Sequence, residues 1–290
     1  MREALLLDVD NTLTPPRRPL EAGMAEVLKA LQVPFFLVAG SDLPLVREQF
    51  LEPLFAFGYR GRFDAFLCNG STWYRCELAG SADVELVEQF SFERHLGAAR
   101  LLRLKRTVER ALDSEAFRLP SPLTVIGERI VDRGSMMNVA AIGRPKGSLS
   151  KAAYDNREAF CRFDESTGFR RRLMVHLHDE LGDLIEEADL RMSLGGQTSL
   201  DFNVEGYDKS FPLPVLLEAG FSKLTYVGDA LFPGGNDETV LRFIADWSRI
   251  AARYPHFSDC PVTAIAVRNH LETADLLCGL GLARIEAPIL

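Results

Sequence analysis

The chain has 290 residues, of which 47% are hydrophobic and 26% are charged, a composition that excludes disordered and fibrous proteins. Its 33 lysines and arginines against 41 aspartates and glutamates give a formal net charge of −8. This acidic balance disfavours a broad binding surface for nucleic acid or for an anionic membrane, so we expect neither partner. An anionic ligand should instead bind in a local pocket.

The cysteines and the N-terminus bear on the compartment of the protein. The five cysteines have no CxxC spacing and no neighbouring pair of histidines, so neither a disulfide framework nor a zinc site is indicated. The apolar run at residues 4–7 is too short for a signal peptide, and no stretch approaches the ~20 apolar residues that cross a bilayer. We therefore expect a soluble, cytoplasmic protein with reduced thiols.

The first predicted element is a strand over residues 4–7. All four residues are apolar, a pattern typical of a strand that is buried on both faces of a parallel sheet. The run stops at Asp8, and Asp10 follows before Pro15 and Pro16, which can continue neither a ladder nor a helix. Both aspartates should lie at the carboxyl end of this strand, where open α/β sheets bind ligands.

The same pattern recurs along the chain. Apolar periodicity predicts a helix over 24–31, a strand over 34–39 and, near the end, another strand over 224–227. The polar residues that follow the predicted strands are Asp8, Asp10, Ser41, Asp229, Asn236 and Asp237. Because right-handed crossovers bring the carboxyl ends of parallel strands to one edge of the sheet, we expect these side chains to converge.

A cation is expected among these side chains. Carboxylates held close together repel each other unless a cation lies between them, and oxygen donors without histidine or cysteine suit Mg²⁺. The candidate metal ligands are Asp8, Asp10, Asp229, Asn236 and Asp237. The alternative is that each of these residues only caps a helix or ends a loop.

These motifs resemble those of a known superfamily. Residues 8–12, Asp-Val-Asp-Asn-Thr, resemble the DxDxT first motif of the haloacid dehalogenase superfamily of phosphotransferases. Ser41 resembles its second motif, Lys209 its third, and residues 228–229 with 235–237 its fourth. The order and the spacing of the motifs agree with that superfamily.

A closer resemblance, to eukaryotic-type phosphomannomutases, covers nearly the whole chain. It rests on residues 13–17, 40–42, 69–70, 95–97, 138–139, 142–144, 195–197 and 232–237. The resemblance implies an α/β fold with a Rossmann-like core and a parallel sheet over residues 1–83 and 204–290. It implies an inserted α+β cap domain of the C2b type over 84–203.

The chain departs from the resembled pattern at four places. Asn11 stands where the pattern usually has glycine, and Ala230 stands where it usually has lysine. One insertion lies between Arg144 and Arg157, and a longer one follows Asp237. The motifs for phosphoryl transfer are intact, but the insertions leave open whether the acceptor is a sugar or water.

Phosphoryl transfer needs a nucleophile, charge neutralisation and a proton donor. Asp8 is the candidate nucleophile and would form an aspartyl-phosphate, and Asp10 is the candidate general acid and base. Ser41 would donate to a phosphoryl oxygen, and Lys209 would neutralise charge. The alternatives are that Asp8 only binds the metal, that Ser41 caps a helix, and that Lys209 is a solvated loop lysine.

In the resemblance, the substrate contacts come mainly from the cap. Arginine binds phosphate through its planar fork, so convergent arginines could hold the non-reacting end of a phosphorylated sugar. The implied contacts are Arg17 of the core and Arg133, Asn138, Arg144, Arg157, Ser199 and Asp201 of the cap. Lys151 is the alternative to Arg157, and each cap arginine could instead be a solvated charge or part of an ion pair at the rim. We interpret the run at 170–172, three arginines, as solvated charges or partners in ion pairs at the rim.

The preferred hypothesis is a Mg²⁺-dependent phosphotransferase of the phosphomannomutase type. The resemblance implies conversion of mannose 6-phosphate to mannose 1-phosphate through a bisphosphate intermediate. One alternative is a sugar-phosphate phosphatase that uses the same acids, and another is a non-catalytic sugar-phosphate-binding protein. Predicted amphipathic cap helices over 101–112 and 174–185 would allow a homodimer through the cap.

Overall fold

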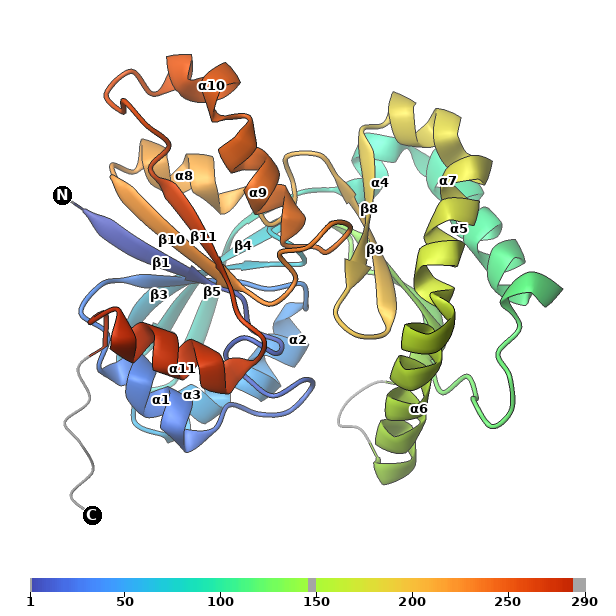
Figure 1. Ribbon diagram of the computed structural model, residues 1–290, viewed down its shortest axis with the longest axis horizontal. Coiled ribbons are helices and arrows are strands. Elements are labelled where there is room, and N and C mark those ends of the chain that lie inside the picture. Colours follow the sequence, from blue (N-terminus) through green and yellow to red (C-terminus); the bar gives the residue numbers. More distant parts are fainter. Residues whose placement is uncertain (1, 146–149, 284–290) are drawn as a thin grey trace. The chain divides into compact units, whose positions relative to one another are not determined.

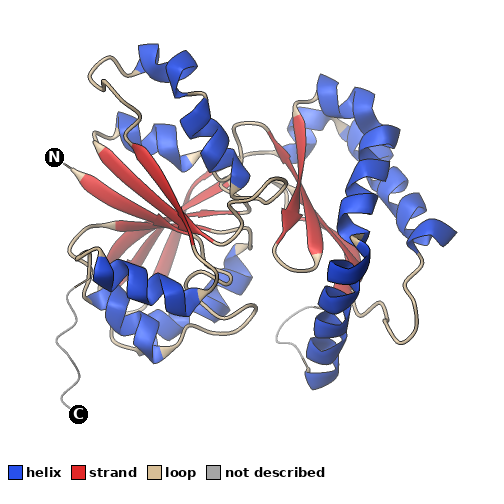
Figure 2. Ribbon diagram, viewed as in Figure 1, coloured by secondary structure: helices blue, strands red, loops and turns tan. Residues whose placement is uncertain are grey.

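The computed structural model describes residues 2–145 and 150–283, and the chain forms two compact units (Figures 1 and 2). The core unit consists of Met1–Gln89, Asp208–Pro233 and Asp237–Leu290. The cap unit consists of Phe90–Tyr207 together with Gly234–Asn236. No helix of the described residues is long and apolar enough to cross a membrane.

The core unit is built on a seven-stranded sheet in the order β11-β10-β1-β2-β3-β4-β5. Its strands are β1 (Glu3–Leu7), β2 (Phe35–Val38), β3 (Gly61–Leu67), β4 (Thr72–Leu78), β5 (Ala82–Gln89), β10 (Lys223–Gly228) and β11 (Val262–Ala266). Neighbours from β11 to β3 pair in parallel, whereas β3, β4 and β5 pair antiparallel. This parallel-rich sheet confirms the predicted α/β class.

Helices cover both faces of the core sheet. They are α1 (Ala22–Lys29), α2 (Leu43–Val46), a π-helix (Arg47–Leu51), α3 (Glu52–Ala56), α8 (Pro212–Glu218), α9 (Glu238–Ala245), α10 (Trp247–Ile250), a 3-10 helix (Ala251–Arg253) and α11 (His270–Gly279). Figure 1 shows α1, α3 and α11 on one face of the sheet and α8 and α9 on the other.

Burial of both sheet faces explains the apolar strand sequences. Leu5 and Leu7 of β1 belong to a hydrophobic cluster with α1 and α11, whereas Ala4 and Leu6 belong to a second cluster with α8 and α10. Because side chains alternate between the faces of a strand, a strand covered on both sides needs apolar residues throughout. Trp247 of α10 packs in the second cluster, so the segment after Asp237 contributes to the core.

The cap unit has its own sheet and its own hydrophobic cluster. The four-stranded antiparallel sheet has the order β6-β7-β9-β8, and its helices pack in one cluster. The elements are α4 (Phe92–Leu96), α5 (Ala98–Asp113), a 3-10 helix (Glu115–Phe117), β6 (Glu128–Asp132), β7 (Met137–Arg144), α6 (Lys151–Thr167), α7 (Phe169–Glu187), β8 (Leu190–Gly195) and β9 (Ser199–Val204). The helices predicted over 101–112 and 174–185 are parts of α5 and α7.

The limits of the cap unit differ from the predicted range of 84–203. The cap unit begins at Phe90 because β5 pairs along β4 and so completes the core sheet. It also includes Gly234–Asn236, where the backbone N–H of Leu194 donates to the carbonyl of Gly234 at 2.7 Å. Residues 146–149, in the insertion after Arg144, lie outside the described part of the chain.

Candidate active site

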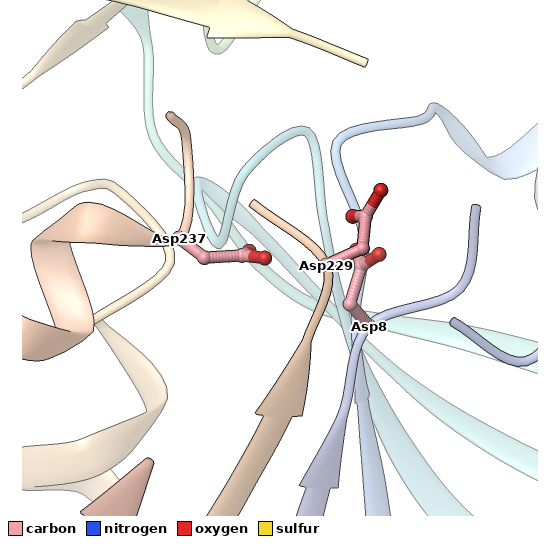
Figure 3. Close-up of side chains that lie close together, drawn as sticks. All are labelled: Asp8, Asp229 and Asp237. Atoms are coloured by element: carbon pink, nitrogen blue, oxygen red, sulfur yellow. The ribbon is translucent and has the colours of Figure 1, made fainter. Parts of the chain in front are cut away.

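Three aspartates come together at the carboxyl edge of the core sheet (Figure 3). In the pairing of β1 with β10, Leu7 lies opposite Val227, so Asp8 and Asp229 follow neighbouring strand ends. Asp237 stands at the N-terminus of α9, yet its side chain does not cap that helix. The carboxylates of Asp8, Asp229 and Asp237, which we call the acidic cluster, each have an oxygen within 4.8 Å of the others.

Lys209 joins two members of the acidic cluster. Its Nζ donates to Oδ1 of Asp8 and to Oδ1 of Asp237, at 2.6 Å in each case. The residue is only 1% exposed, so the alternative of a solvated loop lysine is wrong. The lysine directly follows Asp208, the residue at which the chain returns to the core unit.

The carboxylate of Asp237 is held by neutral donors as well. The hydroxyl of Tyr226 donates to Oδ1 at 2.7 Å, and the backbone N–H of Ala230 donates to Oδ2 at 2.9 Å. A Cβ at Gly228 would lie 2.4 Å from Oδ2 of Asp237, so only glycine leaves room for the carboxylate. Asp237 thereby fixes the position of Lys209. Tyr226 was not a predicted site residue, because in sequence it belongs to a buried apolar strand.

The acidic cluster carries an excess of negative charge. When all groups are ionised, three carboxylates and one ammonium leave two uncompensated negative charges. Burial raises the pKa of Asp8 to about 8, with Asp237 and Asp229 adding to the shift and Lys209 opposing it. Burial and then Asp237 raise the pKa of Asp229 to about 6. Oxygen donors with this excess charge fit a divalent cation of the magnesium type.

The loop after β1 supports the acidic cluster. The hydroxyl of Thr12 donates to Oδ2 of Asp8 at 3.1 Å, and the side-chain amide of Asn11 donates to Oδ2 of Asp229 at 2.8 Å. Asp10 is not part of the cluster, and its Oδ1 accepts the backbone N–H of Arg17 at 2.7 Å. The structure thus brings the predicted residues Asp10 and Arg17 together in the loop after β1.

Ser41 and Asn236 are two further residues that the sequence predicts for the site. Ser41 lies beyond β2, and its carbonyl accepts the backbone N–H of Cys68 at 3.0 Å. The N-cap of α2 is Asp42, so the alternative interpretation of Ser41 as the N-cap of this helix is wrong. Asn236 is buried and directly precedes Asp237, and its role as a metal ligand stays a prediction.

Four predicted cap residues form a connected group, which we call the cap polar network. Asn138 lies opposite Asp201 in the pairing of β7 with β9, and its amide donates to Oδ1 of Asp201. Arg144 donates from Nε to Oδ1 of Asn138 and from Nη2 to the hydroxyl of Ser199, the latter at 2.9 Å. A Cβ at Gly195 would lie 2.6 Å from the carboxylate of Asp201. Glycine at this position therefore leaves space for the network.

The turn between β8 and β9 distinguishes Arg157 from Lys151. Arg157 is 8% exposed and donates to the hydroxyl of Thr198 at 3.0 Å and to Oε1 of Gln197 at 3.2 Å. Lys151 is exposed and pairs with Asp155 at the start of α6. Of the two candidates, the structure joins Arg157 to the turn that leads into Ser199.

Arg170 forms an ion pair and also binds backbone carbonyls. Its guanidinium pairs with Asp164 at 2.6 Å and donates to the carbonyls of Gly196 at 2.9 Å and Ser199 at 3.3 Å. Of the two interpretations, a solvated charge is therefore wrong for Arg170, which forms an ion pair. A separation of six residues is not a contact distance on one helix, and the pair meets because Gly168, in a left-handed conformation, ends α6 and redirects the chain.

Arg133, the remaining predicted cap residue, lies in the connection between β6 and β7. Its backbone N–H donates to the carbonyl of Met136 at 3.0 Å, and its side chain is partly exposed. Its contact with substrate stays a prediction.

Sequence comparisons identify a family and several relatives of this chain. The model of the family described as eukaryotic phosphomannomutase matches residues 23–247. A probable phosphomannomutase from Caenorhabditis elegans is 29% identical over 246 residues, which cover 82% of this chain and 86% of that protein. A phosphomannomutase from Schizosaccharomyces pombe is 31% identical over 241 residues, covering 80% of this chain and 82% of that protein.

Comparison with solved structures identifies the same fold at low sequence identity. An N-terminally truncated IMP-nucleotidase from Plasmodium falciparum has a TM-score of 0.60 and 15% identity, covering 96% of this chain and 70% of the other. The C-terminal domain of trehalose-6-phosphate phosphatase from C. albicans has a TM-score of 0.56 and 13% identity. The match covers 96% of this chain and 92% of that domain. These structures bear on the fold alone.

The predicted resemblance is thus confirmed by the family match and by relatives that share most of their length with this chain. The chain is an enzyme with the fold of the haloacid dehalogenase superfamily, and it belongs to the eukaryotic phosphomannomutase family.

Proposed function

We propose that this enzyme is a Mg²⁺-dependent phosphotransferase that interconverts mannose 6-phosphate and mannose 1-phosphate through an aspartyl-phosphate on Asp8. The observation that carries the proposal is the environment of Asp8. Its buried carboxylate follows β1, is paired with Lys209 at 2.6 Å and has two further carboxylates close by. A buried carboxylate that is paired with an ammonium group and lies among further oxygen ligands for a metal ion is suited to attack phosphorus.

The chain's own residues divide the work of phosphoryl transfer. An oxygen of Asp8 bonds to phosphorus as the bond from phosphorus to the sugar oxygen breaks, and Asp10 gives its proton to that leaving oxygen. In the reverse direction Asp10 removes the proton from the attacking hydroxyl. The backbone N–H of Arg17, 2.7 Å from Asp10, supports this side chain. Ser41 would donate to a phosphoryl oxygen, and Lys209 would neutralise charge on the phosphoryl group and Asp8.

The acidic cluster and the residues next to it would supply the metal ligands. Asp8 and Asp229 would bind the ion directly, together with the backbone carbonyl of Asp10 and the side chain of Asn236. Asp237 accepts three hydrogen bonds, from Lys209, Tyr226 and the backbone N–H of Ala230, so we assign this residue to holding Lys209 in place. Magnesium, when bound, would neutralise the excess charge of the acidic cluster and of the phosphoryl oxygens.

The cap polar network is assigned to the non-reacting end of the substrate. Guanidinium groups bind phosphate oxygens in pairs, and buried amide and carboxylate groups select sugar hydroxyls by hydrogen bonding. Arg17, Arg133, Asn138, Arg144, Arg157, Ser199 and Asp201 are the proposed substrate-binding residues. A homodimer through the cap stays a prediction, and the exposed Leu102 of α5 and Val175 of α7 are apolar side chains available for it.

An isomerase assay tests the proposal. Purified protein with Mg²⁺, mannose 6-phosphate and a hexose 1,6-bisphosphate primer should produce mannose 1-phosphate, measured by ³¹P NMR. Asp8→Asn should abolish turnover because an amide cannot act as the nucleophile, whereas Asp83→Asn, on the exposed strand β5, should retain it. Steady release of inorganic phosphate without isomer, independent of primer, would instead identify a sugar-phosphate phosphatase.

A further inference from the structure

The side chain of Asn11 links three strand ends of the core sheet. Its Nδ2 donates to Oδ2 of Asp229 at 2.8 Å and to the backbone carbonyl of Arg268 at 3.1 Å. Asn11 lies in the loop after β1, Asp229 follows β10, and Arg268 follows β11. One amide group thus connects the carboxylate of Asp229 to the loop after β1 and to the segment after β11.

The backbone at this position restricts which residues can occupy it. Asn11 has a φ of 67°, in the left-handed region that favours glycine and tolerates asparagine better than most residues. Its backbone N–H donates to the carbonyl of Thr14 at 2.9 Å, which closes the turn. Glycine, which is usual at this position of the motif that the chain resembles, would adopt this backbone conformation without donating to Asp229. The turn alone therefore does not account for asparagine.

The residue after Asp229 is also unusual for the pattern. Ala230 stands where lysine is usual, and it contributes its backbone N–H to Asp237 at 2.9 Å. No cationic side chain is therefore present at position 230 beside the Asp229 carboxylate, whereas the amide of Asn11 supplies a neutral donor to it. A neutral donor orients a carboxylate without cancelling the negative charge that a cation requires.

We infer that Asn11 is a positioning residue that holds Asp229 in place to bind the divalent cation. The inference rests on the metal site of the proposed function. Hydrogen-bond partners of metal ligands fix the orientation of those ligands and raise the affinity for the metal. Asn11 therefore sets the strength of metal binding without touching the sugar phosphate.

The test is the substitution Asn11→Gly with direct measurement of Mn²⁺ binding, by electron paramagnetic resonance of the free ion. Glycine accepts the backbone conformation, so only the amide donor is lost. Mn²⁺ affinity should fall by about 10- to 100-fold, as for other partners of metal ligands. Asp189→Gly is the matched control, because Asp189 has a φ of 48° and lies in the cap unit. It should leave Mn²⁺ affinity unchanged.

A second readout separates positioning from general damage to the fold. The Mg²⁺ concentration that half-activates Asn11→Gly should rise by a similar factor, while its KM for sugar phosphate at saturating Mg²⁺ stays within about two-fold of the wild type. Unchanged Mn²⁺ affinity in Asn11→Gly, or an equal loss in Asp189→Gly, would overturn the inference alone. A wild-type protein that binds no Mn²⁺ would overturn both the inference and the proposed metal site.

Discussion

The chemistry of the acidic cluster depends on the burial of individual carboxyl groups. Burial raises the pKa of Asp8 to about 8 and that of Asp229 to about 6. An acid with a raised pKa in the folded chain favours folding most at low pH, and this contribution is lost as the pH rises through the folded pKa. The carboxylates of Asp8 and Asp237 raise the pKa of Lys209 against the effect of burial, so this group stays charged throughout that range.

These shifts predict that the stability of the metal-free protein falls with rising pH, whereas the stabilisation by Mg²⁺ grows. Between pH 6 and 8 the unfolding midpoint of the metal-free protein should fall as Asp8 and Asp229 ionise, whereas Mg²⁺ should raise it more at pH 8 than at pH 6. Scanning fluorimetry across this range measures both effects. Asp8→Asn should flatten the metal-free decrease because it removes one of the two titrating groups. An equal increase with Mg²⁺ at both pH values would contradict this explanation.

Residues at the strand ends were the most predictable part of the site. Asp8, Asp229 and Asp237 follow motifs in the sequence, and parallel strand order is enough to bring the first two together. The hydrogen bonds from Tyr226 and Asn11 to the acidic cluster could not be predicted. No sequence pattern indicates which acceptor a hydroxyl in an apolar strand or an amide in a turn will bind. Their contacts depend on the register of β1 with β10 and on where α9 begins.

At the scale of elements, the turn between β8 and β9 is held by two arginines from different helices. Arg157 of α6 binds side chains of the turn, and Arg170 of α7 binds its backbone carbonyls at Gly196 and Ser199. Carbonyls near the end of a strand need donors when they are removed from water. The turn that leads into Ser199, a proposed substrate-binding residue, is therefore fixed by the cap's own helices.

Removing one of these arginines should loosen the turn. We expect Arg170→Ala to lower the free energy of unfolding by about 1–3 kcal/mol, since Asp164 and two carbonyls lose a partly buried donor. It should also raise KM for the sugar phosphate more than it lowers kcat. Urea unfolding and steady-state kinetics measure the two effects. Arg172→Ala, an exposed neighbour on α7, is the control, and equal effects of both substitutions would contradict the role of Arg170.

Strands differ in how well their sequences predict them. The predicted strands at 4–7, 34–39 and 224–227 correspond to β1, β2 and β10, because strands covered on both faces consist of apolar runs. Strand β5 is mostly exposed at the edge of the sheet and carries charged residues, so its sequence lacks that pattern. This difference explains why the predicted cap begins at 84 and the cap unit begins at Phe90.

At the scale of the whole molecule, the cap unit is a long insertion between two parts of the core sheet. The chain enters the cap unit at Phe90 and leaves it at Tyr207, and the rings of these two residues stack with centroids 3.9 Å apart. The core supplies the acidic cluster and Lys209, whereas the cap supplies a separate polar network. The division matches the two tasks of the proposed reaction, transfer of the phosphoryl group and recognition of the sugar phosphate.

The central claim is that Asp8 carries the phosphoryl group during turnover. The most direct measurement is mass spectrometric mapping of phosphate on protein quenched in acid during reaction with Mg²⁺ and a hexose bisphosphate. We predict a phosphate on the peptide that contains Asp8. Addition of hexose monophosphate should remove this phosphate, and the Asp8→Asn protein should lack it. Full turnover without a phosphorylated protein, or a transferable phosphate on another residue, would contradict the claim.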